Sequence, residues 1–363
     1  MSSVTREQVE SAIKHYIDPC LQQDLVSAKC IKNIAIEGDK ATVDVQLGFP
    51  AKGHEAALVN KMKEQIIGVD GISDAAINIS TKIEAHAAQK GVKPIEGVKN
   101  IIAIASGKGG VGKSTTAVNL ALALQTEGAT VGILDADIYG PSQPRMLGVT
   151  DKPESKDGKS LEPLMGHGVQ SMSIGYLIEE ETPMIWRGPM VTQALDQLLN
   201  DTKWRDVDYL IIDLPPGTGD IQLTLAQKVP VSGALIVTTP QDIALLDARK
   251  ALKMFEKVEV SVLGIVENMS IHICSECGHE EHIFGQGGGQ SMSEEYDVDF
   301  IGSLPLDRQI REEVDEGQPT VVADPDGRIT QIYREIARRV SAKLSLQARE
   351  FSAKFPNIVI QNN

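Results

Sequence analysis

The sequence has 363 residues and a formal net charge of −15; 42% of its residues are hydrophobic and 4% are aromatic. This length allows two domains, and the scarcity of aromatic residues predicts aliphatic cores of the kind found in α/β proteins. The acidic balance argues against a nucleic-acid partner, which would require a basic face. No apolar run is long enough to span a membrane and the first residues lack a signal-peptide core, so we expect no membrane partner and a cytoplasmic location.

Residues 1–88 are expected to form a small α+β domain. Thr5 and Gln8 have the spacing of a capping box, which predicts a helix that continues to about residue 16. Turn residues and apolar alternation further along predict strands and one more helix. The expected strands are 30–36, 41–47 and 75–83, and the expected helix is 55–66. Residues 89–98 have the composition of a linker.

Residues 99–347 are expected to form an α/β domain, followed by a C-terminal tail at 348–363. Short apolar runs alternate here with helical patterns, which predicts a doubly wound, mostly parallel sheet with helices on both faces. The expected strands are 101–105, 130–134, 209–214, 234–238, 262–266 and 300–304. Ligands bind at the carboxyl ends of the strands in such sheets, so each functional motif should directly follow a strand.

Residues 107–115 read GKGGVGKST and follow the first of these strands directly. The run satisfies the P-loop pattern GxxxxGK[ST], in which backbone N–H groups and the start of a helix bind phosphate. We expect Lys113 to contact the β- and γ-phosphates and Ser114 to contribute to a Mg²⁺ site. The expected nucleotide-binding residues are Gly107, Lys108, Gly109, Gly110, Val111, Gly112, Lys113, Ser114 and Thr115.

Lys108 lies inside this loop, where it is either an ordinary solvated lysine or a functional charge. The run KGGVGKST resembles the deviant Walker A loop of the ATPases that include septum-positioning and plasmid-partition proteins, the nitrogenase iron protein and Mrp/ApbC-type iron–sulfur carriers. That resemblance implies that Lys108 reaches across a homodimer interface to the nucleotide of the partner subunit.

Acidic residues follow two further predicted strands. Asp135 and Asp137 are two residues apart, so on an extended chain they would point the same way, toward Mg²⁺ and the attacking water. A role as helix cap or turn former is an equally weighted alternative for such a pair. Asp213 ends the run YLIID, a Walker B pattern, and is expected to support Mg²⁺. We therefore predict Lys108, Lys113, Asp135, Asp137 and Asp213 as the catalytic residues.

Residues 274–282 read CSECGHEEH and follow the strand predicted at 262–266. Cys274 and Cys277 have the CxxC spacing that allows both thiols to reach one metal. Three chemistries stay open: a structural Zn²⁺ with His279 and His282, a redox dithiol, and an iron–sulfur cluster. A cluster takes four thiolates and this segment supplies two, so two copies in a homodimer would supply all four.

Several motifs together resemble the Mrp/ApbC iron–sulfur carrier ATPases from about residue 98 to 345. They are SGKGGVGKST at 106–115, LDADIYGPS at 134–142, IDLPPGTGD at 212–220, NMS at 268–270, the CxxCG run, and IFGQGGG at 283–289. The first ninety residues resemble the small iron–sulfur-assembly domain that precedes the ATPase in many bacterial members. The resemblance implies an ATPase that holds a bridging 4Fe–4S cluster at its homodimer interface and delivers it to apoproteins, with upstream scaffold proteins as further partners.

The resemblance also bears on single residues. It implies that Asn268, otherwise an ordinary turn residue, contacts adenine, so the nucleotide is ATP. Cys20 and Cys30 are interpreted first as buried or incidental thiols, while a role in cluster handling stays open for Cys20 beside Asp18. The alternative function is a dimer-switch ATPase with a structural zinc site, acting in spatial organisation or as a partner-binding scaffold.

Overall fold

The computed structural model describes residues 4–86, 92–178 and 188–354, with side chains described as far as residue 347 except at position 189. The described chain divides into two compact units, each with its own core. The smaller unit comprises residues up to Glu84 together with the end of the last helix from Ser341, and the larger runs from Ala85 to Val340. None of the described helices is long and apolar enough to cross a membrane.

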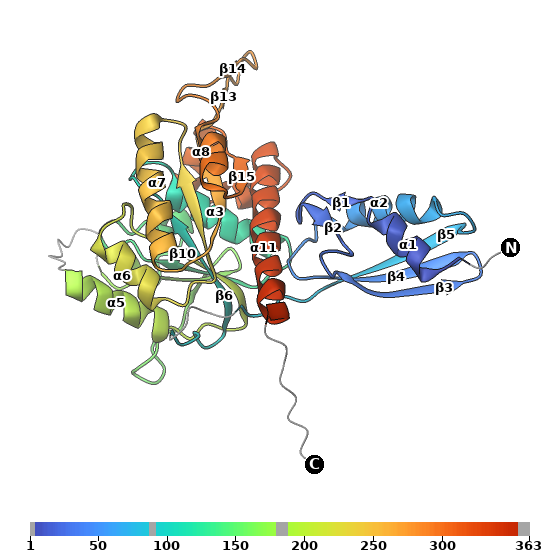
Figure 1. Ribbon diagram of the computed structural model, residues 1–363. Coiled ribbons are helices and arrows are strands. Elements are labelled where there is room, and N and C mark those ends of the chain that lie inside the picture. Colours follow the sequence, from blue (N-terminus) through green and yellow to red (C-terminus); the bar gives the residue numbers. More distant parts are fainter. Residues whose placement is uncertain (1–3, 87–91, 179–187, 355–363) are drawn as a thin grey trace. The chain divides into compact units, whose positions relative to one another are not determined.

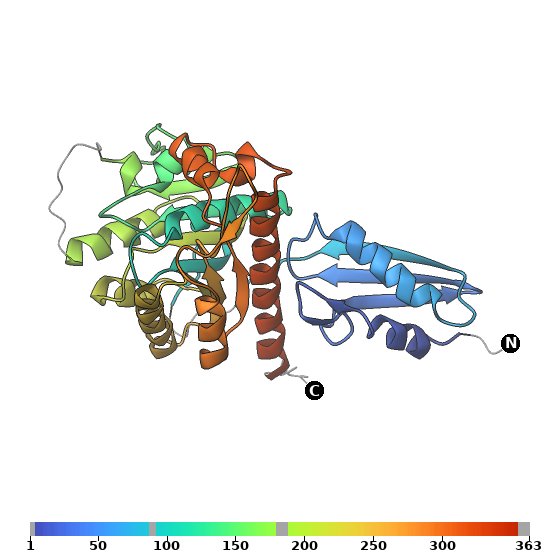
Figure 2. The ribbon, with the colours of Figure 1, turned by 90° about the horizontal axis from the view of Figure 1, so that it is seen from above.

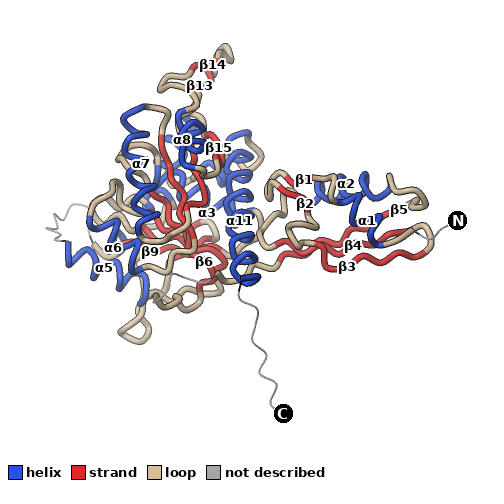
Figure 3. The backbone as a smooth tube through the Cα atoms, in the orientation of Figure 1, coloured by secondary structure: helices blue, strands red, loops and turns tan. Residues whose placement is uncertain are grey.

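The smaller unit has two helices on one face of a sheet that has three strands in its described residues (Figures 1 and 3). Strand β4 alternates between buried and partly exposed residues, because only one face of the sheet is covered. The predicted capping box is confirmed: the Thr5 side chain accepts from Gln8 N–H and the Gln8 side chain from Thr5 N–H. The elements are α1 Arg6–Ile13, β1 Ile17–Asp18, β2 Gln23–Asp24, β3 Ile31–Glu37, β4 Lys40–Leu47, α2 Glu55–Ile67 and β5 Asp74–Thr81.

Two sequence expectations for this unit need adjustment. The first helix ends at Ile13 rather than near residue 16, and the last strand ends at Thr81, so Ile83 lies beyond it. Residues 341–347, expected within the ATPase domain, contribute Ala342 to the core of the smaller unit. The predicted linker lies partly outside the described residues, and the predicted domain boundaries stay predictions.

The larger unit is built on a sheet of eight strands in the described residues, in the order β15-β12-β11-β6-β10-β7-β9-β8. All neighbouring pairs are parallel except β8 with β9. The six strands predicted from apolar runs are present, and the β8–β9 hairpin was not predicted. The strands are β6 Val98–Ala105, β7 Val131–Asp135, β8 Leu164–Gly166, β9 Val169–Ser173, β10 Val207–Asp213, β11 Gly233–Thr238, β12 Val262–Glu267 and β15 Phe300–Ser303.

Helices cover both faces of this sheet, which confirms the predicted doubly wound α/β architecture. Helices α5 to α8 pack on one face, and α3 packs on the other with α4, α9 and α10 (Figure 2). The helices are α3 Lys113–Thr126, α4 Gln143–Met146, α5 Gly188–Asn200, α6 Asp220–Lys228, α7 Asp242–Lys257, α8 Gly288–Tyr296, α9 Arg308–Asp315, α10 Thr320–Ala323 and α11 Arg328–Lys354.

A buried ion cluster holds the C-terminal end of α3. The Glu127 carboxylate, fully buried, accepts from Arg334 at 2.7 Å and from Arg338 at 2.6 Å. Removing one partner of such a cluster leaves buried charge uncompensated, at a cost of about 3–5 kcal/mol. The cluster therefore fixes α3, and with it the loop that precedes α3, against the first half of α11.

Candidate functional site

The predicted P-loop connects the central strand β6 to α3, at the carboxyl edge of the sheet. Gly112 directly precedes the helix with φ of 81°, and a Cβ atom at this position would lie 2.1 Å from the Asn268 side-chain nitrogen. A Cβ on Gly107 would lie 2.0 Å from the backbone of Asp247 in α7. Only glycine fits at these two positions, so the loop backbone packs closely against α7 and Asn268, in a loop of the kind whose backbone N–H groups bind phosphate.

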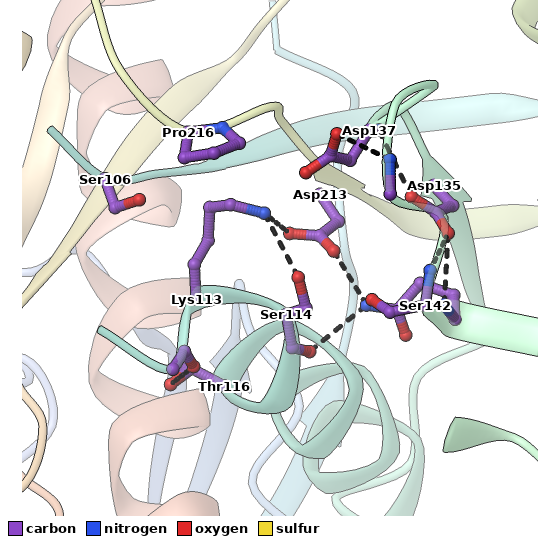
Figure 4. A network of polar contacts seen from close by, with 12 residues as sticks. Ser106, Lys113, Ser114, Thr116, Asp135, Asp137, Ser142, Asp213 and Pro216 are labelled. Atoms are coloured by element: carbon purple, nitrogen blue, oxygen red, sulfur yellow. Dashed lines mark hydrogen bonds and ion pairs between the residues drawn. The ribbon is translucent and has the colours of Figure 1, made fainter. Parts of the chain in front are cut away.

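Lys113 and Asp213 form a buried ion pair in this site (Figure 4). The Lys113 Nζ also lies 3.2 Å from Ser114 Oγ. Asp213 is the last residue of β10 and is fully buried, with β6 and β7 as its neighbouring strands. The fold thus brings together the P-loop lysine, the P-loop serine and the Walker B acid, as expected for a triphosphate–Mg²⁺ site.

Asp135 organises the loop that follows β7. Its Oδ2 accepts from the N–H groups of Ser142 at 2.9 Å and Gln143 at 3.0 Å, and its Oδ1 accepts from Asp137 N–H at 3.2 Å. Burial, and then the nearby Asp213 carboxylate, raise the pKa of Asp135 to about 7. These contacts agree with the turn-forming alternative for Asp135, and its catalytic role stays a prediction.

Asp137 lies on the loop beyond the end of β7. The strand ends at Asp135, so the extended-chain spacing from which we expected both acids to point the same way does not apply, and their shared orientation stays a prediction. Asp137 is half-buried, and Figure 4 places it beside Asp213. Burial raises the pKa of its carboxyl, while the nearby Lys113 opposes that shift. Its position is compatible with a role at the reacting phosphate, which stays a prediction.

Gln143 is a site residue that sequence reasoning missed. Its side-chain amide donates to Asp213 Oδ2 at 2.9 Å and to the Ser114 carbonyl at 3.1 Å, and the residue is buried. Among the described residues, its Oε1 and the Ser142 Oγ are buried without a hydrogen-bond partner. Buried polar atoms normally have partners, so these two oxygens suit a site completed by a ligand or water. A glutamine in a four-residue helix carries no sequence signal for this role.

The loop after Asp213 lies against the P-loop. Gly217 N–H donates to the Ser106 carbonyl at 2.9 Å, and Gln222 Nε2 donates to the Pro216 carbonyl at 2.6 Å. Pro216 also lies 3.9 Å from the position that a Cβ on Gly109 would take. The loop is therefore placed to respond to what the P-loop binds.

Asn268 directly follows β12 and contacts the P-loop. Its Nδ2 donates to the Val111 carbonyl at 2.9 Å, and its backbone N–H donates to Thr238. The bond from the side-chain nitrogen leaves the side-chain oxygen of Asn268 as an acceptor, which would suit the amino group of adenine. Contact with adenine stays a prediction. The preceding residue, Glu267, is buried and accepts from Gly289 N–H at 2.6 Å, which holds the start of α8.

Lys108 is exposed at the surface of the P-loop. Its backbone carbonyl accepts from the Ser106 hydroxyl at 2.9 Å, which fixes the loop while the side chain extends outward. This exposed position fits both an ordinary solvated lysine and a lysine that reaches the nucleotide of a partner subunit, so the second role stays a prediction.

The two CxxC cysteines lie at the tip of a short hairpin that projects from the larger unit (Figure 1). Strands β13 His272–Ile273 and β14 Glu280–Glu281 pair antiparallel, and Cys274 N–H donates to the His279 carbonyl at 2.9 Å. Cys277 is exposed and Cys274 half-buried. Backbone N–H groups of Cys277 and Glu276 lower the pKa of the Cys274 thiol, which favours the metal-binding thiolate.

No third metal-ligand side chain joins the two sulfurs in the part of the chain that the structure describes. Within the described residues, no histidine, aspartate or glutamate ligand atom lies within 4.8 Å of both cysteines. The His282 ring is engaged elsewhere, since its Nδ1 lies 2.8 Å from the Ser270 carbonyl. The Cys₂His₂ zinc site considered from sequence is therefore not preassembled in the described residues.

Comparison with known families identifies both units. The family model described as NUBPL iron-transfer P-loop NTPase matches residues 97–341, and the model described as iron-sulfur cluster assembly protein matches residues 6–79.

Individual relatives agree with these matches. An iron-sulfur cluster carrier protein from Salmonella typhimurium is 51% identical over 94% of this chain and 93% of its own length. The mouse iron-sulfur cluster transfer protein NUBPL is 48% identical over 77% of this chain and 88% of its own. A solved nucleotide-binding protein from Archaeoglobus fulgidus in complex with ADP has a TM-score of 0.56 and 37% identity, covering 64% of this chain and 90% of that one.

Proposed function

The chain belongs to the family of NUBPL-type iron-transfer P-loop NTPases, and from that premise we propose that it is an ATPase that assembles a 4Fe–4S cluster at its homodimer interface and transfers it to apoproteins. The observation that carries this proposal is the projecting Cys274/Cys277 hairpin, whose two thiols form no close group with a third metal-ligand side chain in the described residues. A relative that is 51% identical is named an iron-sulfur cluster carrier protein, which supports an iron–sulfur cluster as the group that is carried.

The residues around the P-loop fit ATP with Mg²⁺. Lys113 would hold the β- and γ-phosphates, while Ser114 and Asp213 would hold the metal directly or through water. When bound, Mg²⁺ neutralises charge on the transferring phosphoryl group. The partnerless Gln143 Oε1 beside Asp213 supplies an additional acceptor for a metal-bound water. The related Archaeoglobus protein in complex with ADP supports the nucleotide.

Ligand counting favours a cluster shared between two chains. A 4Fe–4S cluster takes four thiolates, and each hairpin offers two. Two hairpins related by a two-fold axis would complete the set. The lowered pKa of Cys274 keeps a larger fraction of that thiol ionised before the cluster arrives.

An apolar surface next to the P-loop supports the dimer. Ile243 and Leu246 of α7 and Ile283 after the hairpin are large aliphatic residues that are at least half exposed. The segment after the hairpin lies near the start of α7, since a Cβ on Gly285 would be 3.6 Å from the Pro240 carbonyl. Burying this surface against a second copy would bring the exposed Lys108 to the partner's nucleotide.

Two loops would couple the nucleotide state to this interface. Asp135 anchors the loop that carries Asp137 and Gln143, and Gly217 anchors the loop after β10 to the P-loop. Release of the γ-phosphate would loosen both loops and reposition the hairpins. No side chain in the described site is held tightly as a general base for the attacking water. We therefore expect slow ATP hydrolysis, typical of a molecular switch, with a turnover number below about 10 per second.

The partners and location follow from this activity. Recipients would be apoproteins that lack their clusters, and donors would be upstream scaffold proteins. We place the protein in the cytoplasm, where reduced thiols persist.

Anaerobic reconstitution with iron and sulfide tests the proposal. We expect the Cys274→Ala/Cys277→Ala protein to bind about four fewer irons per dimer than the wild type and to lose the broad visible absorption of the cluster. Cys30→Ala, which removes a fully buried thiol of the smaller unit, should leave the iron content unchanged. A colourless protein with about one zinc per chain, lost on the double substitution, would instead support the dimer-switch ATPase with structural zinc.

A further inference from the structure

A second group of metal-ligand side chains lies in the smaller unit, formed by Asp18, Cys20 and His54. One ligand-type atom from each lies within 4.8 Å of the other two, and this is the sole such group of three among the described residues. Asp18 ends β1, Cys20 follows two residues later, and His54 immediately precedes α2. The group therefore joins two segments of the chain, around residues 18–20 and at the start of α2, that lie against one hydrophobic core.

The Asp18 carboxylate is fully buried and rigidly oriented. Its Oδ1 accepts from the backbone N–H groups of Cys20 at 2.8 Å and Leu21 at 3.0 Å. Its Oδ2 lies 2.9 Å from His54 Nε2, and the Tyr16 hydroxyl bonds the same side chain. A buried carboxylate is costly unless it is paired, so the fold maintains it here for interaction with a cation or with donors.

His54 provides the opening to solvent. It occupies the N-cap position of α2 but makes no side-chain capping bond, because its ring is turned to Asp18. Its side chain is 11% exposed, whereas the Asp18 side chain is 0% exposed and Cys20 is 7% exposed. An ion could therefore reach the group past the imidazole without unfolding the core.

We propose that Asp18, Cys20 and His54 bind one divalent first-row transition-metal ion of the Zn²⁺ or Fe²⁺ class. One carboxylate oxygen, one thiolate and one imidazole nitrogen are ligands suited to these ions, while Ca²⁺ and Mg²⁺ prefer oxygen alone. On binding, the Cys20 thiol releases its proton to solvent, and the metal replaces the direct contact between Asp18 and His54. Three protein ligands leave a fourth position open for water or an exchanging thiolate.

The hydrogen bonds from two backbone N–H groups to Asp18 Oδ1 would support the proposed metal site. They hold the carboxylate in place while Oδ2 faces the ion, as outer-shell partners do in other metal sites. Cys30 offers a contrast in the same core: it is fully buried, its thiol lies 3.7 Å from the Ala28 carbonyl, and it belongs to no group of three metal-ligand side chains among the described residues. The proposal is independent of the bridging cluster, since it uses none of the hairpin residues.

Anaerobic Co²⁺ titration of the full chain tests the site. The Cys274→Ala/Cys277→Ala background removes the exposed thiols, so any thiolate-to-cobalt charge-transfer band must come from Cys20 or Cys30. We expect one Co²⁺ per chain with that band, its loss in Cys20→Ala and its retention in Cys30→Ala. Absence of the band in the background protein, or an unchanged band in Cys20→Ala, would overturn the proposal and leave a hydrogen-bonded contact that closes a turn.

A second variant separates loss of the ligand from loss of the fold. His54→Gln alters a partly exposed side chain, so the core should remain intact by circular dichroism and urea unfolding. We expect it to weaken Co²⁺ binding by more than about 100-fold, since loss of an outer-shell partner alone costs about 10- to 100-fold. Co²⁺ affinity equal to that of the background protein would remove His54 from the ligand set and overturn the three-ligand site.

Discussion

Gln143 donates its side-chain amide to Oδ2 of Asp213 at a distance of 2.9 Å. The backbone N–H of the same glutamine donates to Oδ2 of Asp135 at 3.0 Å. One residue thus connects the carboxyl ends of β10 and β7, and it also reaches the P-loop through the Ser114 carbonyl. Asp213, which we assign to the Mg²⁺ site, and Asp135, which anchors the neighbouring loop, are therefore connected by a residue outside the recognised motifs.

Substituting Gln143 should impair hydrolysis more than nucleotide binding. Gln143→Ala removes the amide that orients Asp213, and a misplaced catalytic group costs about 10- to 100-fold in kcat. Gln143→Glu places a third carboxylate beside Asp135 and Asp213 and should be worse at low Mg²⁺ concentration. Steady-state ATPase assays and fluorescent-ATP titration measure the two effects separately. Gln309→Ala, on the exposed start of α9, is the matched control. Equal losses in kcat and ATP affinity would argue against a positioning role.

The close packing of the P-loop predicts a difference between two of its glycines. Gly112 has φ of 81° and a Cβ there would lie 2.1 Å from Asn268, whereas a Cβ on Gly109 would meet nothing nearer than 3.9 Å. Gly112→Ala should therefore lower the free energy of unfolding of the nucleotide-free protein by about 2–4 kcal/mol. Gly109→Ala should change it by less than about 0.5 kcal/mol. Urea unfolding without nucleotide measures both, and equal stability of the two variants would contradict the packing argument.

The parallel sheet was predictable because its strands are continuous apolar runs, as in 209–214, and because each motif had to follow a strand. The β8–β9 hairpin was missed because β8 has only three residues and β9 contains polar residues, Gln170 and Ser171, which are buried here through side-chain hydrogen bonds. Polar residues that are buried through hydrogen bonds to other parts of the fold produce no apolar pattern in the sequence.

The site residues that belong to a sequence motif could be predicted, because the motif itself determines where they lie. Those that come together only through the fold of a loop could not be predicted. The P-loop spacing identified Lys113 and Ser114, while the position of Gln143 depends on how the loop after Asp135 turns back. The Asp18, Cys20 and His54 group joins residues 36 positions apart, so sequence spacing alone could suggest only Cys20 beside Asp18.

The environment of Cys274 predicts an unusually reactive thiol. Backbone N–H groups of Cys277 and Glu276 stabilise its thiolate and lower its pKa. In a Cys277→Ser protein these N–H donors remain, so alkylation of Cys274 should reach half of its limiting rate below pH 8.5, about the pKa of an ordinary cysteine. Iodoacetamide labelling at a series of pH values, with mass spectrometry of the peptide, measures this. Cys20 and Cys30 are buried and should label slowly. A midpoint at or above pH 8.5 would contradict the predicted stabilisation.

Mixing two inactive variants tests whether Lys108 acts across the dimer. Lys113→Ala removes the lysine that holds phosphate within one chain, and Lys108→Ala removes the exposed lysine assigned to the partner's nucleotide. In a mixed dimer, one site combines the intact Lys113 of the Lys108→Ala chain with the intact Lys108 of the Lys113→Ala chain. Equal mixing should therefore restore about a quarter of wild-type ATPase activity, since half of the dimers are mixed and each has one complete site. If Lys108 acted within its own chain, both sites of the mixed dimer would lack a lysine, and the mixture would be as inactive as its components.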